Sequence, residues 1–208
     1  MKIAIAQLNP IVGDVDGNTR RILETLESQR GVDLVIFPEL FISGYPPRDL
    51  LELPSFIERC AAAARRVAEA TSRSDMPAAL FGCPIRTESP SGNPLFNAAL
   101  LAHDGNLVVA QRKTLLPTYD VFDESRYFEP APSVDVLPFG QEWLGVSICE
   151  DAWNDPEMWP ERRYERDPVA DLARKGATFF VNISASPYTV GKERLRLALV
   201  ARHAREYA

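Results

Sequence analysis

The order in which strand-like and helix-like segments follow one another constrains the fold of this chain more than any other feature of its sequence. Short apolar runs that are typical of buried strands alternate with helical patterns at both ends of the chain, whereas paired runs that indicate hairpins occupy the middle. This mixed order predicts an α/β protein in which sheet packs on sheet and helices lie outside. The expected strands are Ile3 to Leu8, Val32 to Phe37, Ala78 to Gly82, Phe96 to His103, Leu107 to Lys113, Val134 to Phe139, Trp143 to Ile148 and Thr178 to Ile183.

Turn and capping residues set the expected boundaries of these segments. The Asp104-Gly105 pair is a strong signal for a hairpin turn between two of the runs. Asp167 followed by Pro168 is typical of a helix start, because aspartate caps the first turn and proline fits its first position. The expected helices are one that begins within 14–18 and ends at Gly31, one from Phe56 to about Ser72, one from Asp167 to Gly176, and one from Gly191 to Glu206.

Composition restricts the class of protein. The chain has 208 residues, of which 46% are apolar and 25% charged, as is typical of one globular domain. Its 23 basic and 29 acidic residues give a net charge of −6, which disfavours nucleic acid as a partner. No apolar stretch approaches the length of a membrane span, and the first apolar run is too short for a signal peptide. We therefore expect a cytoplasmic protein that binds neither membranes nor nucleic acid.

The cysteines and histidines exclude several kinds of site. Cys60, Cys83 and Cys149 are far apart in the sequence and form no Cys-x-x-Cys pair, so neither a disulfide scaffold nor a zinc module is expected. The two histidines, His103 and His203, leave little from which to build a Ser-His-Asp, Cys-His or histidine-based metal site. We expect no metal site, and any cysteine chemistry requires a base other than histidine.

Three reactive side chains each stand where an expected strand gives way to a loop. Cys149 follows one apolar run directly, Glu39 follows another through a proline, and Lys113 ends the second hairpin strand. Taken singly, each has an ordinary alternative: an inert buried thiol, a solvated or helix-capping carboxylate, and an exposed lysine. Because strand ends in layered α/β folds can converge on one pocket, the three together suggest a nucleophile, a general base and a cation that stabilises an oxyanion.

The segments around these residues resemble the motifs of the nitrilase superfamily of carbon–nitrogen hydrolases. Three motifs in this order are far more specific than one, and the resemblance covers the whole chain. It implies an α-β-β-α sandwich and a Glu-Lys-Cys triad made of Glu39, Lys113 and Cys149. The motifs are Phe37-Pro38-Glu39-Leu40 followed by Ser43-Gly44-Tyr45, then Arg112-Lys113-Thr114-Leu115-Leu116-Pro117, and then Ser147-Ile148-Cys149-Glu150-Asp151-Ala152-Trp153.

Within this superfamily the sequence is most similar to the N-terminal glutaminase domains of glutamine-dependent NAD+ synthetases. That resemblance implies that Cys149 attacks the carboxamide of L-glutamine, with Glu39 as general base and Lys113 at the oxyanion. It also implies that the released ammonia passes to an ATP-dependent synthetase domain, which amidates nicotinic acid adenine dinucleotide. The segments that carry it are Gly44-Tyr45-Pro46-Pro47-Arg48-Asp49-Leu50-Leu51, Tyr119-Asp120-Val121-Phe122-Asp123-Glu124, Arg126-Tyr127-Phe128, and Asn182-Ile183-Ser184-Ala185-Ser186-Pro187-Tyr188 with Gly191-Lys192.

The same resemblance implies a glutamine pocket with an aromatic wall and a few charged groups, which suits a small zwitterion. Core packing is the alternative for each aromatic residue, and a water-facing first-turn lysine is the alternative for Lys192. In the same region, Glu124 and Arg126 are expected to form an ion pair that orients Lys113 or its loop. The implied pocket residues are Tyr45, Tyr119, Phe122 and Trp153 as the wall, Glu150 at the α-amino group, and Ser186 and Lys192 at the α-amino and α-carboxylate ends.

The sequence departs from the family in two respects. The family's sandwich continues for several strands beyond the position of Ala208, and the synthetase motif Ser-Gly-Gly-x-Asp-Ser is absent. We therefore expect residues 1–208 to form an incomplete glutaminase domain that needs no cofactor, with ATP and Mg²⁺ used by a synthetase domain outside this chain. A homo-oligomer is expected as well. Two alternatives stay open: a stand-alone amidase or carbamoylase with the same triad, and a catalytically silent domain that binds partners.

Overall fold

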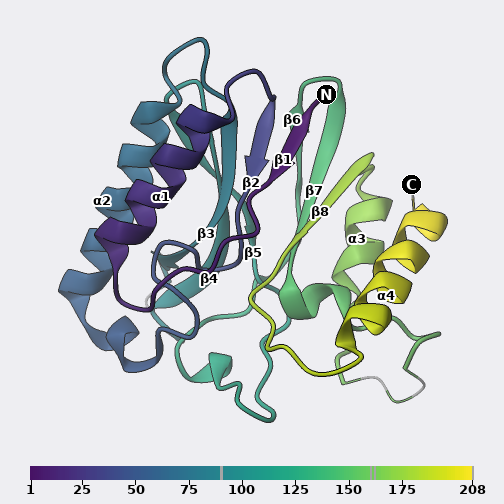
Figure 1. The fold of residues 1–208 in the computed structure, drawn as a ribbon. Helices are drawn as coiled ribbons and strands as arrows, with labels where there is room; N and C mark the ends of the chain where they lie inside the picture. The colour runs from purple at the N-terminus through teal and green to yellow at the C-terminus, as the bar shows by residue number, and fades with distance from the viewer. Residues whose placement is uncertain (90, 160, 162, 208) are drawn as a thin grey trace.

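The computed structural model describes residues 1–89, 91–159, 161 and 163–207, and its elements form four layers in the order helix, sheet, sheet, helix (Figure 1). On one side, α1 (Val15–Ser28) and α2 (Pro54–Ala70) cover the larger sheet. On the other side, α3 (Pro168–Arg174) and α4 (Lys192–Tyr207) lie outside the smaller sheet. The α-β-β-α sandwich predicted from the sequence is confirmed.

The two sheets differ in size and in strand direction. The larger sheet has the order β1-β2-β3-β4-β5, in which the first three strands are parallel and the last two are antiparallel to their neighbours. Its strands β2 and β5 therefore run in the same direction. In the smaller sheet β7 is antiparallel to β6 and parallel to β8. The strands are β1 (Ile3–Ile5), β2 (Leu34–Ile36), β3 (Ala78–Arg86), β4 (Leu95–His103), β5 (Asn106–Arg112), β6 (Val136–Phe139), β7 (Glu142–Ile148) and β8 (Phe179–Ile183).

Alternate side chains from the facing sides of the two sheets fill the space between them. Because successive side chains of a strand point to opposite faces, each strand gives one set to this central core and the other set to a helical layer. A second core lies between the larger sheet and its two helices. The central core contains Leu34, Ala78, Leu80, Ala99, Leu101 and Ala110 from the larger sheet and Phe139, Leu144, Val146, Ile148, Val181 and Ile183 from the smaller one.

Local sequence signals explain the main turns and helix starts. Asp104 and Gly105 both have positive φ, 49° and 77°, as a tight hairpin turn between β4 and β5 requires. Asp14 caps α1 by accepting a hydrogen bond from the Gly17 N–H at 3.0 Å. Asp167 does the same for α3 through the Ala170 N–H at 3.1 Å. Three short 3₁₀ helices complete the fold: Arg48–Glu52, Glu124–Arg126 and Cys149–Ala152.

Several strands differ in length from the sequence-based expectation, most of all β1, β2 and β3; β2 is limited to Leu34–Ile36, the residues that pair with both β1 and β3. β1 ends at Ile5 because the chain turns back on itself, with the Leu8 N–H donating to the Ala6 carbonyl at 2.8 Å. β3 continues beyond Gly82 to Arg86 although it contains Pro84. The proline is tolerated because β2 pairs with β3 only as far as Leu80. At Pro84 the side of β3 that faces away from β4 is therefore an edge, where no described strand needs the N–H that proline lacks.

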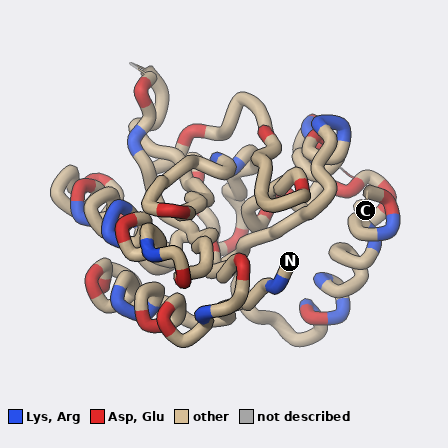
Figure 2. Tube along the Cα trace, turned by 90° about the horizontal axis from the view of Figure 1, so that it is seen from above, with Lys and Arg blue, Asp and Glu red and all other residues tan. Residues whose placement is uncertain are grey.

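Charged residues of both signs are interspersed along the helices that cover the larger sheet (Figure 2). Exposed ion pairs such as Arg59 with Asp16, at 3.0 Å, join α2 to α1. Screened pairs of this kind stabilise a fold only slightly. In the part of the chain that the structure describes, no helix has the length and apolar character that crossing a membrane demands.

Candidate active site

The carboxyl ends of three strands bring Glu39, Lys113 and Cys149 together. Glu39 lies just beyond β2, Lys113 follows β5 directly, and Cys149 follows β7 directly. The ammonium of Lys113 is 2.8 Å from Oε1 of Glu39, and both side chains are fully buried. The Cys149 thiol is close enough for the charges of both residues to act on it. A thiol, a carboxylate and an ammonium therefore share one water-poor site between the two sheets.

Gly82 has no side chain, and the turn that carries Glu39 can therefore lie directly against β3. A Cβ atom at Gly82 would lie 1.9 Å from the backbone nitrogen of Leu40, which is impossible without moving that turn. The Gly82 N–H donates to the Pro38 carbonyl at 3.2 Å, and Leu40 adopts a positive φ of 47°. From the segment that follows β8, the Ala185 N–H donates to Oε2 of Glu39 at 3.0 Å. Both oxygens of this carboxylate are thus engaged by fixed donors.

Cys149 occupies a sharp turn from strand to 3₁₀ helix. Its φ of 46° lies in the left-handed region that side-chain-bearing residues rarely adopt, so the nucleophile candidate sits on strained backbone. Burial, reinforced by the charge of Glu39, raises the pKa of the Cys149 thiol to about 12, although Lys113 and a hydrogen bond with Ser184 act in the opposite direction. The resting thiol is therefore neutral near pH 7, and it needs a base before it can attack.

Glu124 adds a second carboxylate to the site. Its Oε1 is 2.7 Å from the Lys113 ammonium and accepts a hydrogen bond from the Tyr45 hydroxyl at 2.9 Å. Burial alone would lower the pKa of Lys113, but Glu39 and Glu124 hold it well above its usual value. Burial also raises the pKa of Glu124, with Lys113 opposing the shift. Lys113 is thus a permanent cation between two carboxylates.

The expected ion pair between Glu124 and Arg126 is wrong. Glu124 points inward to Lys113, whereas Arg126 lies at the surface, 3.4 Å from Glu52 and 3.7 Å from Asp49. The short 3₁₀ helix that contains both residues turns their side chains to different sides. Glu124 does orient Lys113, but without the arginine.

Asn97 and Asp151 are buried polar residues at the site that the sequence reasoning missed. Asn97 donates from Nδ2 to Glu39 Oε1 at 2.8 Å. Asp151 accepts backbone N–H bonds on both oxygens, and burial raises its pKa to about 7. Each had a visible signal: Asn97 interrupts an otherwise apolar strand, and Asp151 stands two residues after the cysteine. Polar residues in these positions need partners if they are buried.

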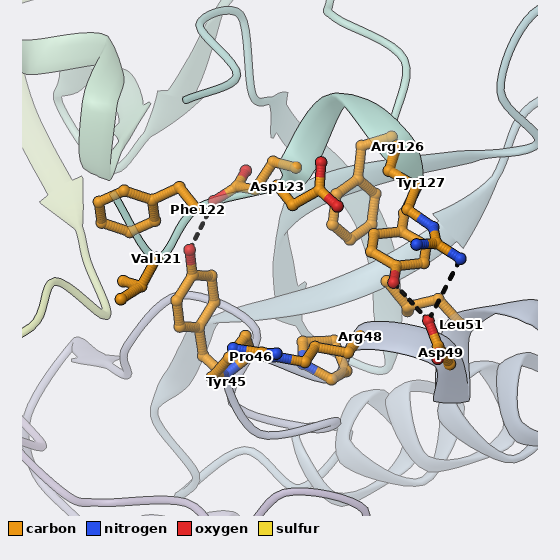
Figure 3. Close-up of a pocket in the computed structure, with 13 residues that line it drawn as sticks. Tyr45, Pro46, Arg48, Asp49, Leu51, Val121, Phe122, Asp123, Arg126 and Tyr127 are labelled. Atoms are coloured by element: carbon orange, nitrogen blue, oxygen red, sulfur yellow. Dashed lines mark hydrogen bonds and ion pairs between the residues drawn. The ribbon is translucent and has the colours of Figure 1, made fainter. Parts of the chain in front are cut away.

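Two of the implied pocket residues, Tyr45 and Phe122, line a cavity of about 220 Å³ that reaches Glu124. Figure 3 shows Tyr45 and Phe122 near one end of this cavity, with Asp49, Arg126 and Tyr127 toward the other. The Tyr45 hydroxyl points to the Glu124 carboxylate, so the aromatic wall and the charged cluster are in direct contact.

Three further pocket residues, Tyr119, Glu150 and Trp153, line a second cavity of about 130 Å³. The Tyr119 hydroxyl lies 2.9 and 2.8 Å from the two oxygens of Glu150. Tyr164, which no motif of the sequence singles out, also donates to Glu150, at 3.1 Å. The rings of Tyr119 and Phe122 are 5.5 Å apart, and this contact joins the two cavities' walls.

Ser186 and Lys192 form a pair beside the second cavity. The Lys192 ammonium donates to the Ser186 hydroxyl and to the Pro187 carbonyl, the latter at 3.1 Å. It also lies 5.6 Å from the centre of the Trp153 ring. Lys192 is therefore connected to the pocket through Trp153, although neither Ser186 nor Lys192 is among the residues that line the two cavities.

Metal ligands do not gather in this site. Across the described residues, no group of three or more His, Cys, Asp or Glu side chains has the arrangement to hold a metal ion. Lys113 is the cation that faces both carboxylates of the site, and a carboxylate, an ammonium and a thiol together can carry out acyl transfer.

Known proteins with the same architecture include both synthetases and amidases. The chain is 40% identical to a glutamine-dependent NAD(+) synthetase from Synechocystis sp., over 99% of this chain and 37% of the relative. The structure of a glutamine-dependent NAD+ synthetase from Acinetobacter baumannii matches with a TM-score of 0.84 and 32% identity, over 99% of this chain and 36% of that one. An amidase from Nesterenkonia sp. matches with a TM-score of 0.77 and 25% identity, over 98% and 71%.

These matches cover nearly all of this chain but only part of each synthetase relative. The chain spans about a third of the length of the curated synthetase relatives that it matches. A family model described as carbon-nitrogen hydrolase matches residues 2–205, which is nearly the whole chain. With its two-sheet sandwich and its three converging strand ends, the chain belongs to the carbon-nitrogen hydrolase family.

Proposed function

We propose that this chain is the glutamine-hydrolysing part of a glutamine-dependent NAD+ synthetase. The observation that carries the proposal is the buried Glu39–Lys113 pair next to the Cys149 thiol. The relatives' names supply the substrate, since synthetases of that name match almost the whole length of this chain. In this proposal ammonia released from L-glutamine is used by an ATP- and Mg²⁺-dependent synthetase domain outside residues 1–208, in a cytoplasmic homo-oligomer.

The first half of the reaction forms a thioester. Glu39 accepts the thiol proton of Cys149, and the sulfur attacks the carboxamide carbon of the glutamine side chain. The electron pair of the carbonyl moves to its oxygen, where Lys113 stabilises the negative charge. Lys113 has three N–H donors, of which Glu39 and Glu124 accept two, so one remains for this oxyanion. The tetrahedral intermediate collapses, Glu39 returns its proton to the leaving nitrogen, and ammonia departs.

The second half regenerates the enzyme. Glu39 takes a proton from water, and the resulting hydroxide attacks the thioester carbon. The carbon–sulfur bond breaks, glutamate leaves, and the proton on Glu39 returns to the sulfur of Cys149. Glutamine and water thus give glutamate and ammonia with no net change in the protein. A high thiol pKa suits this cycle, because the proton must be removed for each attack.

Glutamine turnover by the full-length protein is the direct test. We expect glutamate release in the wild type, none in Cys149→Ala, and a glutamyl adduct on Cys149 by mass spectrometry after rapid acid quenching. An active wild type without that adduct, under conditions in which deacylation limits the rate, would exclude covalent catalysis. Alkylation by iodoacetamide should also be faster at Cys149 than at the fully buried Cys60 and Cys83. Equal rates at the three thiols would favour a catalytically silent domain.

A stand-alone amidase is the second candidate, because the Nesterenkonia amidase shares the fold and most of its own length with this chain. Lys192→Ala separates the two. If Lys192 holds the amino-acid end of glutamine, this variant should raise KM for glutamine at least tenfold and leave turnover of propionamide unchanged. Lys175→Ala is the matched control, since Lys175 is a surface residue that pairs with Asp135 at 2.6 Å. Equal turnover of both substrates in the wild type would favour the amidase.

A further inference from the structure

Asn97, on β4, contacts all three charged residues of the site. Its Nδ2 donates to Oε1 of Glu39 at 2.8 Å and, over a longer distance of 3.5 Å, to Oε2 of Glu124. Its backbone carbonyl accepts a hydrogen bond from the Lys113 N–H at 2.8 Å. The residue is completely buried. One amide side chain therefore bridges the two carboxylates, while its backbone fixes the lysine between them.

The orientation of this amide is informative. Within the described part of the chain, Oδ1 of Asn97 is buried and has no hydrogen-bond partner. A buried acceptor left without a partner is destabilising. The opposite orientation would turn this oxygen toward the carboxylates of Glu39 and Glu124, where like partial charges repel. Donation to the carboxylates therefore determines how the side chain lies.

The charges around Asn97 explain why a neutral donor is useful at this position. The groups that face it are the carboxylates of Glu39 and Glu124 and the ammonium of Lys113, with the Cys149 thiol and the Tyr45 hydroxyl next to them. Two carboxylates and one ammonium leave one negative charge in excess in a buried site. An amide N–H stabilises an ionised carboxylate without adding charge, because a hydrogen bond to the charged form favours that form.

We propose that Asn97 is a positioning residue for the general base, which donates a hydrogen bond to the Glu39 carboxylate and holds it apart from that of Glu124. This inference rests on the proposed role of Glu39 in glutamine hydrolysis. It predicts a specific defect when the donor is lost: the base is protonated at a higher pH than in the wild type. A residue needed only for packing would lower activity equally at every pH.

The test compares pH profiles of kcat/KM for glutamine in the full-length wild type and in Asn97→Leu. Leucine has the same number and branching of side-chain heavy atoms as asparagine but no hydrogen-bond donor. We expect the acidic limb of the profile to move up by about one pH unit, so that activity falls about tenfold on that limb and recovers at higher pH. A uniform loss at all pH values in a folded variant would overturn the inference.

A second variant covers the case in which Asn97→Leu does not fold. Asn97→Asp keeps the shape of the side chain and replaces the donor with a third carboxyl group, so the acidic limb should again move to higher pH. An acidic limb like that of the wild type would overturn the inference. Gln111→Leu is the matched control, because Gln111 is a buried amide on β5 whose Nε2 donates to backbone carbonyls. This variant should leave the acidic limb of the kcat/KM profile at its wild-type pH.

A readout without glutamine separates this inference from the proposed function. The rate of Cys149 alkylation by iodoacetamide, followed by mass spectrometry as a function of pH, reports on the thiol and its base directly. If the wild type does not hydrolyse glutamine but Asn97→Leu shifts this alkylation profile, the proposed substrate is wrong and the proposed role of Asn97 is supported. If the wild type hydrolyses glutamine and neither profile shifts, the role of Asn97 is wrong and the function stands.

Discussion

The carboxylate of Asp151 accepts a hydrogen bond from the backbone N–H of Leu115 at 2.8 Å and so joins the segments that carry the lysine and the cysteine. The same oxygen accepts from the Thr114 N–H at 3.0 Å, and the other oxygen from the Ile148 N–H, also at 3.0 Å. Thr114 and Leu115 follow Lys113 directly, whereas Ile148 precedes Cys149. One buried side chain thus fixes the distance between two strand ends in different sheets.

Asp151→Asn should loosen this connection. The amide can accept from some of the three N–H groups but presents its own N–H to another, so at least one buried donor loses its partner. We expect a loss of about 1–3 kcal/mol in the free energy of unfolding, measured by urea denaturation, together with a lower kcat. Unchanged stability and unchanged kcat would show that the hydrogen bonds of Asp151 do not hold the two segments together.

The pH dependence of this effect has a defined sign. Burial raises the pKa of Asp151 from 3.8 to about 7, so the folded state favours the protonated form. The contribution of this group to stability is therefore complete below the unfolded pKa and is lost as pH rises to about 7. We expect the difference in unfolding free energy between wild type and Asp151→Asn to shrink over that interval.

Asp155 offers a control with the opposite sign. Although burial acts against the shift, the Glu157 N–H and Arg202 lower the pKa of Asp155. Its contribution to stability is present above the unfolded pKa and is lost as pH falls. The difference between wild type and Asp155→Asn should therefore grow with rising pH. The same slope for both aspartates would contradict the assignment.

Glu39→Gln tests the general base. The glutamine side chain is nearly isosteric but cannot accept the thiol proton, so we expect kcat for glutamine to fall by about 10²–10⁴-fold. Glu58→Gln, an exposed position on α2, should have wild-type kcat. A folded Glu39→Gln enzyme with more than a tenth of the wild-type kcat would mean that another group removes the proton.

Glu124→Gln removes one carboxylate from the buried cation. We expect the free energy of unfolding to fall by about 1.5–3 kcal/mol, as for the loss of a hydrogen bond between charged groups, because Glu39 still neutralises Lys113. Urea denaturation followed by tryptophan fluorescence measures this change. As a control, Arg59→Ala breaks an exposed ion pair and should cost less than about 1 kcal/mol. Equal costs would indicate that the Glu124–Lys113 pair adds no more than a surface contact.

Gly82→Ala should displace the turn that carries the general base, Glu39. The new methyl group would overlap the Leu40 nitrogen at 1.9 Å, so the turn that carries Glu39 must move. We expect kcat to fall at least tenfold, in addition to an overpacking cost of about 1–3 kcal/mol. In Gly145→Ala the methyl group meets the Ala177 side chain at 2.8 Å, away from the site. That control should lose stability but keep the kcat of its folded fraction.

The sequence predicted the elements of this fold well because turn and capping residues act locally. The Asp104-Gly105 hairpin and the Asp167 cap occur where expected, since each depends on the conformational preference of one or two residues. Strand ends were less predictable because they depend on distant partners. β3 extends through Pro84 because, among the described strands, β2 pairs with it only as far as Leu80.

The site was predictable in its reactive groups but not in its supporting ones. The position of Glu39, Lys113 and Cys149 at strand ends follows from the pattern of apolar runs. Which other polar residues reach them depends on three-dimensional contacts over 58 residues, as between Asn97 and Glu39, and no local pattern encodes such a distance. The expected pairing of Glu124 with Arg126 is wrong for the same reason, because residues that are close in sequence need not be in contact in space.

The division of the site between two sheets has a consequence for the newly made chain. The acid–base partner and the cation follow strands of the larger sheet, whose last described strand ends at Arg112, whereas the sulfur arrives with β7 of the smaller one. Until the smaller sheet packs on the larger one, the Cys149 thiol has no base beside it and the Glu39 carboxylate has no thiol to deprotonate. Base-assisted attack by the thiol therefore becomes possible only when the two sheets have packed together.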